Sequence, residues 1–486
     1  MLKRLASQTA TYGLTSILGR LIGNLLLPLQ TSRLSLRDFS VLSEVLAYAA
    51  VLAVVFPLGL ETALFKFSNE DLSKRKETEQ KIISLQILVA TLLLPLSWVW
   101  LSGRLPDLNS TDLWVIGATL AFDGISGIFL ARIRNESKSG SFLFVRLGSI
   151  LFTIILNLLF LSNIEWLDRM NPIGINYRLI IYINFVSSFL TIFLMPKTLR
   201  QFRFLLDKVL FIKVLKFSIP ILMMGVVGVS NDIFGRIWLE HLTPEGFYGN
   251  LANKDLIGIY SGCAKVAIFI NLGIQAYRYA ADPFFFSIQD KKDTARYLSE
   301  SFTWFVAVGL LALVAIECNI GLIVDIFLRK PEFRLGLNAI FLLLLANFFF
   351  GVYYNLSFWY KFSDKTFWGT LISVFGLCLN AGLNFILVPK FGMTGSAFAL
   401  LICYVGMCGF SWYKSLEVFA VNWAYQKVFT MLLFAVLLCL ISMVWQPETT
   451  VLKLVWGTFL PSLLLILVFY LQKDILFKKL NIDGPS

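Results

Sequence analysis

The stretch SFLFVRLGSILFTIILNLLFLS, residues 141–162, holds a single charged side chain, Arg146, in a run long and apolar enough to cross a bilayer as a helix. Two comparable runs surround Arg20 and Lys265. A cation inside hydrocarbon is costly unless it faces a polar cavity or a partner. These three cations therefore predict a site for something anionic in the middle of the membrane.

The composition extends this interpretation to the whole chain. The 486 residues are 57% hydrophobic and 15% charged, with a mean hydropathy of +0.75, far outside the range of soluble domains. The sequence predicts an all-α polytopic membrane protein with about fourteen transmembrane helices. The predicted spans lie near 9–31, 40–64, 82–102, 112–131, 141–162, 177–196, 214–235, 256–277, 298–323, 337–360, 367–388, 393–413, 424–445 and 450–471.

The charges of the loops predict the orientation. With the N-terminus inside, 27 of the 42 Lys and Arg fall in cytoplasmic segments, 12 in outer segments and 3 within spans. Loops that are rich in Lys and Arg stay on the cytoplasmic side, so both termini are expected to be cytoplasmic. The net charge of +12 reflects this bias and attraction to an anionic leaflet, and it gives no support to nucleic-acid binding.

Few residues offer enzyme or metal chemistry. All six Cys fall within predicted spans, where they act as small apolar residues, and the single histidine, His241, falls in an outer loop. We therefore expect no disulfide framework, no metal site, no cofactor and no catalytic residue. The first apolar stretch lacks a cleavage pattern, which predicts a first helix that is not removed.

A weak internal repeat predicts the domain organisation. The fifth and eleventh spans end on similar motifs, LNLLF at 156–160 and LNFIL at 383–387. A period of six spans indicates parallel repeats, a common transporter plan with the substrate site between the halves. We expect an N-terminal lobe at 1–200, a C-terminal lobe at 201–415 and an additional helix pair at 416–486.

Polar side chains recur at helical spacing in several spans, so we expect them to line a shared aqueous cavity. The candidate substrate-binding residues on these stripes are Arg20, Asn24, Asp123, Arg146, Asn157, Lys265 and Asn384.

Each candidate also has a structural interpretation. Arg146 lies close enough to the cytoplasmic end of its span to extend to the headgroups. Arg20 or Lys265 could instead form an internal ion pair, for example with Asp123. Asn and Ser stripes often join helices to one another. Glu61 and Glu317 are expected to be structural, with coupling of an ion as the alternative.

Four motifs resemble one family. They are Tyr12-Gly13 to Gly19-Arg20 with LPLQT at 27–31, LGLETALFKF at 58–67, GIYS at 258–261 followed by Lys265, and the stretch from Leu383-Asn384 through VPKFGMTGSA at 388–397. The chain resembles bacterial polysaccharide-biosynthesis flippases, the O-antigen or lipid-linked oligosaccharide transporters of the multidrug/oligosaccharidyl-lipid/polysaccharide exporter superfamily.

The resemblance implies a two-lobe fold in the bacterial cytoplasmic membrane. In that fold a cationic cavity takes the pyrophosphate and sugars of a polyprenyl-linked glycan from the inner leaflet and releases them outside. Arg20 and Lys265 match family positions where cavity cations occur. Arg236 follows Gly235 where the family often has Asp-Arg, so its role as a further binding residue is implied less directly.

Elementary electrostatics agrees with an anionic substrate, because fixed cations in a low-dielectric cavity can replace the hydration of a diphosphate. The alternatives are a cation-coupled multidrug exporter of the same superfamily, a polytopic glycosyltransferase or polymerase, and a structural membrane partner. The sugar composition, the coupling ion (H⁺ or Na⁺), the oligomeric state and any partner polymerase or ligase stay open.

Overall fold

In a computed structural model, every regular element among the described residues is a helix, as predicted. The described residues are 24–71, 73–136, 138–161, 174–286, 291–363, 365, 367–418, 421, 423–445, 447 and 449–480. The helices are α2 (Leu27–Arg33), α3 (Leu36–Val55), α4 (Leu60–Ser68), α5 (Arg75–Ser102), α6 (Ser110–Asn135), α7 (Ser139–Leu161), α9 (Tyr177–Phe193), α10 (Pro196–Arg200), α11 (Lys208–Leu242), α12 (Asn253–Phe286), α13 (Lys291–Cys318), α14 (Ile320–Phe327), η1 (Pro331–Gly336), α15 (Leu337–Leu356), α16 (Phe358–Phe362), α17 (Phe367–Val418), α18 (Tyr425–Val444) and α19 (Thr450–Leu480).

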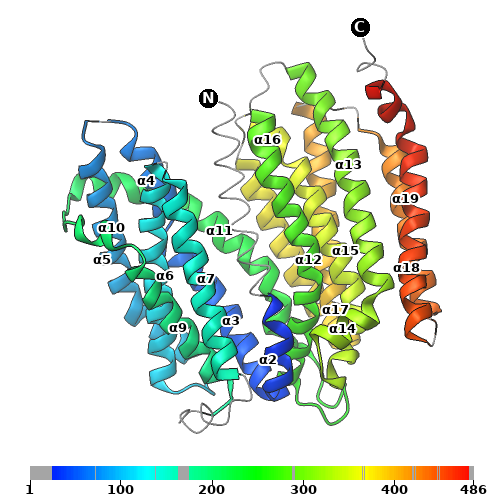
Figure 1. The fold of residues 1–486 in the computed structure, drawn as a ribbon, viewed down its shortest axis with the longest axis horizontal. Helices are drawn as coiled ribbons and strands as arrows, with labels where there is room; N and C mark the ends of the chain where they lie inside the picture. The colour runs from blue at the N-terminus through cyan, green and yellow to red at the C-terminus, as the bar shows by residue number, and fades with distance from the viewer. Residues whose placement is uncertain are drawn as a thin grey trace. The chain divides into compact units, whose positions relative to one another are not determined.

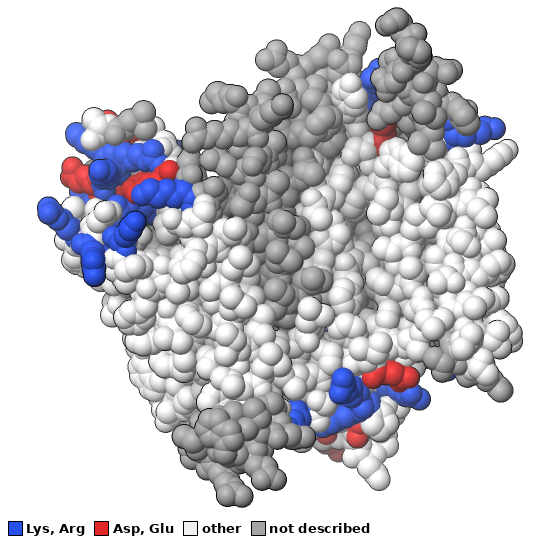
Figure 2. All heavy atoms as spheres, in the orientation of Figure 1, with Lys and Arg blue, Asp and Glu red and all other residues white. Residues whose placement is uncertain are grey.

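Eleven helices in the described part of the chain are long and apolar enough to cross a membrane. Their outer surfaces are apolar: on α18, Phe429, Leu433 and Leu437 are 65%, 62% and 51% exposed at four-residue spacing. Such a stripe belongs against lipid, not water. On the face shown in Figure 2, charged side chains gather near α4, α5 and α10, and the helix surfaces next to them are almost free of charge. The chain is a multi-pass membrane protein.

The helices follow most predicted spans but differ at the first, second, sixth, eleventh and twelfth. Most of the first span lies outside the described residues, and only its end, with α2, is seen. The sixth span corresponds to α9, which has only 17 residues. The eleventh and twelfth spans run together in α17 and are separated by non-helical backbone at Gly392. The count of fourteen spans and the orientation of the termini therefore stay predictions.

The predicted second span is two helices, because the backbone breaks between α3 and α4. Pro57 cannot donate a backbone hydrogen bond, and the next two residues, Leu58 and Gly59, have positive φ values of 47° and 68°. A Cβ at Gly59 would lie 3.3 Å from the carbonyl oxygen of Ser218 on α11. The break thus places Glu61 at the start of α4 and lets α11 approach closely.

A second break shapes α17. Gly392 adopts φ 55° and ψ −130°, a conformation that suits glycine. The ring of Tyr248 packs against it, and the Met393 amide donates a hydrogen bond of 2.9 Å to the Tyr248 hydroxyl. Burial raises the pKa of Tyr248, which lies in the segment between α11 and α12. This contact fixes the turn between the two halves of α17.

Backbone packing divides the described residues into two compact units. The first comprises Met1–Gly262, as far as it is described, and Ser373–Ala399; the second comprises Cys263–Ile372 and Leu400–Ser486, with the same restriction. In the first unit, α6 packs between α5 and α9, and α3 lies along α11 (Figure 1). In the second, α13 packs against α15, α18 and α19. The lobe boundaries predicted from the repeat stay predictions.

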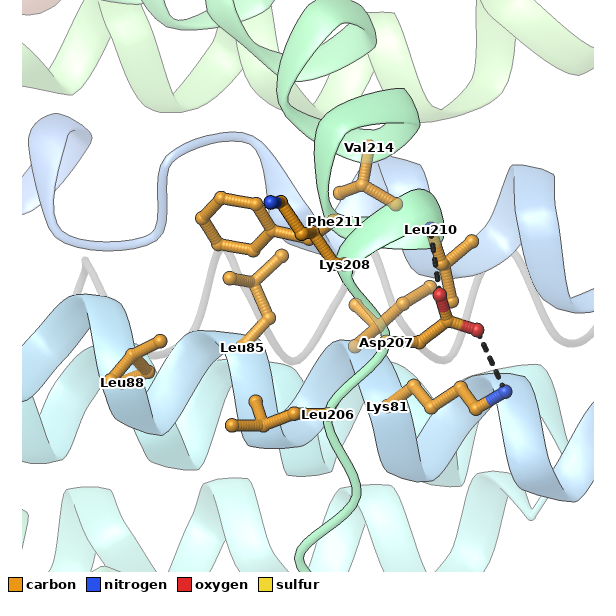
Figure 3. Close-up of a pocket in the computed structure, with 10 residues that line it drawn as sticks. Lys81, Leu85, Leu88, Leu206, Asp207, Lys208, Leu210, Phe211 and Val214 are labelled. Carbon is orange, nitrogen blue, oxygen red and sulfur yellow. Dashed lines mark hydrogen bonds and ion pairs between the residues drawn. The ribbon is translucent and has the colours of Figure 1, made fainter.

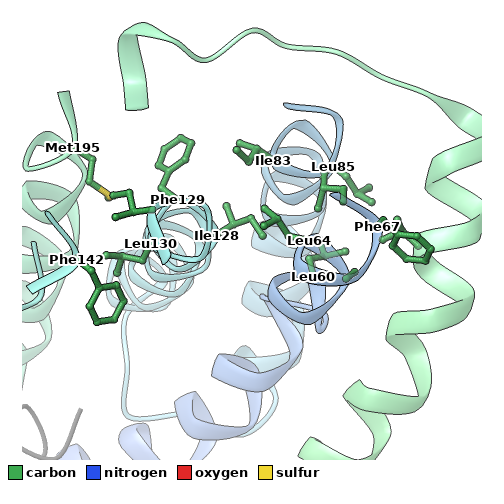
Figure 4. Packing of buried hydrophobic residues seen from close by; sticks show 14 of the residues in the cluster. Leu60, Leu64, Phe67, Ile83, Leu85, Ile128, Phe129, Leu130, Phe142 and Met195 are labelled. Carbon is green, nitrogen blue, oxygen red and sulfur yellow. The ribbon is translucent and has the colours of Figure 1, made fainter. Parts of the chain in front are cut away.

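A buried apolar cluster joins one end of α4 to α7 in the first unit (Figure 4). Leu64 of α4, Ile83 of α5 and Phe129 of α6 are at most 1% exposed, and Phe142 of α7 packs on the same core. The charged ends of α5 and α6, described below, project from this core. Their positions are therefore fixed by apolar packing rather than by the charges themselves.

The segment 201–207, between α10 and α11, is held along α5. Gln80 donates to the carbonyl of Gln201 and accepts from the amide of Arg203. Asp207 caps α11 through the amides of Val209 and Leu210 and pairs with Lys81 at 3.0 Å (Figure 3). Hydrogen bonds from the Leu210 amide and from Lys81 hold the pKa of the Asp207 carboxyl below its usual range.

Candidate functional site

Arg146 has charged neighbours on other helices. From α7 its charge acts on two carboxylates, Glu61 of α4 and Asp123 of α6. Asp123 also accepts a hydrogen bond from Ser188 of α9. Glu61 is held against Gly127 of α6, where a Cβ would lie 2.9 Å from its Oε1. We call Glu61, Asp123 and Arg146 the Arg146 cluster.

The exposure of the cluster indicates what surrounds it. Arg146 and Asp123 are exposed and Glu61 is half-buried, although all three lie in segments long and apolar enough to cross a membrane. Charges at such positions are tolerated where they pair with one another and face water or headgroups. Arg146 therefore has two carboxylates of neighbouring helices, Glu61 and Asp123, within electrostatic range.

Glu61 is the residue of this cluster that the sequence did not single out as a binding residue, and Ser188, which bonds to Asp123, was not singled out either. Glu61 was expected to be structural because it lies near a span end. The break at Pro57 and Gly59 turns α4, and only the folded chain brings its carboxylate near Arg146. A hint lay in the LGLET motif, where an acidic residue stands two positions after a glycine in an apolar run.

The first-span candidates fall at the edge of the described residues. Arg20 lies outside them, so its pairing with Asp123 stays a prediction. Asn24 is described and half-buried, and its Nδ2 has no hydrogen-bond partner among the described residues. That free donor is compatible with the polar stripe predicted for this span.

The candidate amides Asn384 and Asn157 are buried and bonded to protein. Asn384 is 0% exposed and donates to Asn380, which in turn donates to Asn231 of α11 at 2.9 Å and 3.1 Å. Asn157 is 1% exposed and donates to the carbonyl of Thr153, one turn earlier in α7. Asn384 thus belongs to a polar chain between α17 and α11, while the hydrogen bond of Asn157 within the described part of the chain stays inside its own helix.

The remaining candidate cations occupy α11 and α12. Lys265 is half-buried on α12, in the part of that helix assigned to the second unit. Arg236 is half-buried on α11 of the first unit, and its Nε has no hydrogen-bond partner within the described ranges. Among the described residues there is no group of three or more His, Cys, Asp or Glu that could hold a metal.

The side predicted to be outer carries a network of ion pairs within the first unit. Lys254 of α12 lies 3.1 Å from Glu44 Oε2 of α3 and 2.7 Å from Asp107 Oδ2, between α5 and α6. Arg37 adds contacts of 3.2 Å to Asp107 and 3.9 Å to Asp255. We call these five residues the outer ion-pair network. The hydrogen bond from Lys254 holds the pKa of the Asp107 carboxyl below its usual range.

This network holds the first turns of α3 and α12 together. Ser40 of α3 donates to the Asp255 carbonyl at 3.1 Å, and its Oγ packs directly against Gly258, so a side chain there would collide with it. From the sequence, Lys254 is expected only as a charge of an outer loop, because no local pattern pairs it with a residue of the second span.

The fold matches two kinds of solved transporter structure. The lipid II flippase MurJ, in an inward closed conformation, aligns with a TM-score of 0.74 at 16% identity over 95% of this chain and 99% of that one. An inward-facing multidrug resistance MATE family transporter aligns with a TM-score of 0.64 at 10% identity, over 82% of this chain and 95% of that one. The MATE multidrug transporter DinF-BH aligns with a TM-score of 0.62 at 13% identity, over 85% of this chain and 95% of that one.

No family model and no curated protein matches the sequence. The fold nevertheless defines a class: this chain has the fold of transporters of the multidrug/oligosaccharidyl-lipid/polysaccharide exporter superfamily, as the motifs indicated. Because a flippase and drug transporters share that fold, the substrate must be argued from the residues of the site.

Proposed function

We propose that this protein moves a polyprenyl-pyrophosphate-linked oligosaccharide from the cytoplasmic to the outer leaflet of the bacterial cytoplasmic membrane, for cell-surface polysaccharide assembly. The observation that carries the proposal is Arg146, an exposed guanidinium and the single charge of α7, in a chain with the fold of a lipid II flippase. A guanidinium replaces the water around a phosphate by paired, charge-assisted hydrogen bonds. The polyprenyl tail need not leave the lipid.

The candidate residues take different roles in this proposal. Arg20, Arg146 and Lys265 hold the diphosphate. Asp123 and Glu61 balance the charge of Arg146 and are the carboxylates on which a coupling H⁺ or Na⁺ would act. The remaining candidates support the cavity: Asn24 and Arg236 offer donors without a described partner, while Asn157 and Asn384 keep the helices beside it packed.

Alternating access requires that one side be shut while the other is open. The outer ion-pair network fits a state in which the outer side is shut, because it ties α3 to α12 through nearly buried charges. We propose that these pairs separate when the substrate is released outside and form again as the transporter returns.

The second candidate is a cation-coupled multidrug exporter. It is favoured by the two carboxylates of the Arg146 cluster and by the MATE structures that share the fold. A cationic drug would pair with Asp123 or Glu61 instead of with Arg146. No observation on the described residues favours a glycosyltransferase or polymerase.

Complementation of a flippase-deficient strain distinguishes the flippase from the multidrug exporter. We expect the wild-type gene to restore surface glycan and to clear the lipid-linked unit that accumulates inside. Arg20→Ala and Lys265→Ala should each abolish this at unchanged protein level, Arg20→Lys should keep part of it, and Arg104→Ala, at an exposed outer position, should keep all of it. Wild-type export by the Arg20→Ala/Lys265→Ala double variant, or drug efflux without glycan export, would contradict the proposal.

A further inference from the structure

The first unit contains a basic double cavity at the end that is predicted to be cytoplasmic. One hollow, of about 560 Å³, lies between the ends of α5 and α6; a second, of about 400 Å³, lies among α6, α7 and α10. They share four lining residues: Arg132, Glu136, Lys138 and Gln201. We call the pair the Arg132 cavity. It is separate from the Arg146 cluster, none of whose residues lines it.

The charge of the Arg132 cavity favours an anion. Five cations line it, Arg75, Lys76, Arg132, Lys138 and Lys197, against two carboxylates, Glu79 and Glu136. Glu79 is 1% exposed and is satisfied by Arg75 and by Asn135 Nδ2 at 2.9 Å. Burial acts to raise the pKa of Glu136, but Lys138 and Arg132 outweigh it and lower that pKa. Both carboxylates thus have protein partners, and a positive surplus remains.

Arg132 is the centre of the cavity and is not fully satisfied. It is only 4% exposed, and its Nε lies 3.3 Å from both Glu79 Oε2 and Glu136 Oε1. These contacts pair the Nε side of the guanidinium with two carboxylates, while Nη1 makes no hydrogen bond to any described residue. A buried guanidinium with unused donors costs stability unless a ligand or water accepts from it. This side chain therefore points to an acceptor that the protein does not supply.

The second hollow adds an apolar arm beside the charges. Phe144, Val145 and Leu194 line it next to Lys138 and Lys197, and Phe144 is 64% exposed on the outside of α7. A free phosphate would have no use for such a surface. A phospholipid would use both parts, with its phosphate at the cations and the start of an acyl chain along Phe144.

From this geometry we infer that the Arg132 cavity binds the phosphate group of an anionic phospholipid of the inner leaflet. The phosphate accepts from Arg132, Lys138 and Lys197, and the first methylene groups lie against Phe144 and Leu194. The lipid joins α5, α6, α7 and α10, and so stabilises the cytoplasmic end of the first unit. It is a resident lipid and not the transported molecule, so the inference stands apart from the proposed function.

The test is lipid binding to the full-length purified protein in detergent, followed by native mass spectrometry and by the midpoint of thermal unfolding. The probes are phosphatidylglycerol, phosphatidylcholine and inorganic phosphate. We expect retained phosphatidylglycerol and a raised midpoint, with little effect of phosphatidylcholine. The double variant Lys138→Ala/Lys197→Ala removes two exposed cations and should weaken binding roughly 10- to 30-fold.

Matched variants make the outcome specific. Lys74→Ala/Arg200→Ala removes the same charge from exposed positions outside the cavity and should leave binding within about twofold. Phe144→Ser should weaken phosphatidylglycerol binding while leaving any effect of inorganic phosphate unchanged. Equal weakening by both double variants would mean a general surface attraction. Equal stabilisation by inorganic phosphate would mean a site for a free anion. Either result would overturn the lipid site.

Discussion

Lys254 Nζ lies 3.1 Å from Glu44 Oε2, and the two side chains, from α12 and α3, are only 8% and 6% exposed. A buried pair of this kind is not simply stabilising, because both charges lose water when it forms. The pair stabilises the contact only while both charges are present, because either charge buried alone would destabilise it. This makes the pair suited to a contact that must open and close.

Removing one partner should therefore open the outer side. In a cysteine-free background, Lys254→Met leaves Glu44 buried without its cation and should destabilise the closed contact by about 3 kcal/mol. We expect Ser43→Cys, buried on α3, to become reactive to an impermeant thiol reagent from outside. Adding Glu44→Gln should restore much of the protection. Equal labelling with and without Lys254→Met would mean that the pair does not hold the outer side shut.

The Arg146 cluster allows transport to be separated from stability. Arg146→Ala removes the cation that acts on Glu61 and Asp123, so both accumulation and export should fall. Arg146→Ala/Glu61→Gln removes one unpaired carboxylate as well and should recover accumulation. If Arg146 binds phosphate, export should stay at least about tenfold below wild type in that double variant. Recovery of both would show that Arg146 serves only as an ion-pair partner.

Impermeant thiol reagents test the predicted orientation. Ser110 and Asn250 are exposed at the predicted outer side, and Lys76 is exposed at the cytoplasmic side. In intact cells, Ser110→Cys and Asn250→Cys should label and Lys76→Cys should label only after the membrane is permeabilised. Labelling of Lys76→Cys in intact cells would reverse the orientation and refute the positive-inside argument.

The turn in α17 gives a prediction about stability. Gly392→Ala places a side chain at φ 55° and against the ring of Tyr248, so we expect a loss of at least about 1–2 kcal/mol. The control is Gly382→Ala in the same helix, where no atom lies within 4 Å of the new Cβ. That change should be neutral or stabilising by about 0.5–1 kcal/mol. Thermal unfolding in detergent compares the two.

Asp207 gives a prediction about pH. Its pKa is lower in the folded protein than its unfolded value of about 3.9, so its contribution is complete above that value and is lost as the pH falls through the folded pKa. Asp207→Asn should lower the unfolding midpoint at neutral pH, and the difference from wild type should shrink below about pH 4. Lys81→Met should act in the same direction. A difference that does not vary with pH would mean that the charge of Asp207 is not what caps α11.

The composition and the apolar runs of the sequence were enough to predict a polytopic all-α membrane protein. Apolar runs predict helices because a bilayer leaves no water for backbone groups. The sequence also predicted a boundary between spans near Gly392, but it predicted a single span at 40–64, across the break at Gly59. The motifs around Lys265 and at 388–397 indicated a transporter fold, and the chain has the fold of solved MurJ and MATE structures. These signals are local, so a single sequence was enough to detect them.

Only the tertiary structure decided which charges meet. Helical phase placed Asp123 and Arg146 on polar stripes, but Glu61 joins them because a break turns α4, and Lys254 reaches Glu44 across more than two hundred residues of chain. Helical periodicity fixes the face of one helix and is silent about its neighbours. Such pairings depend on how apolar faces pack, and that is settled by the sum of many contacts that no single stretch of sequence records.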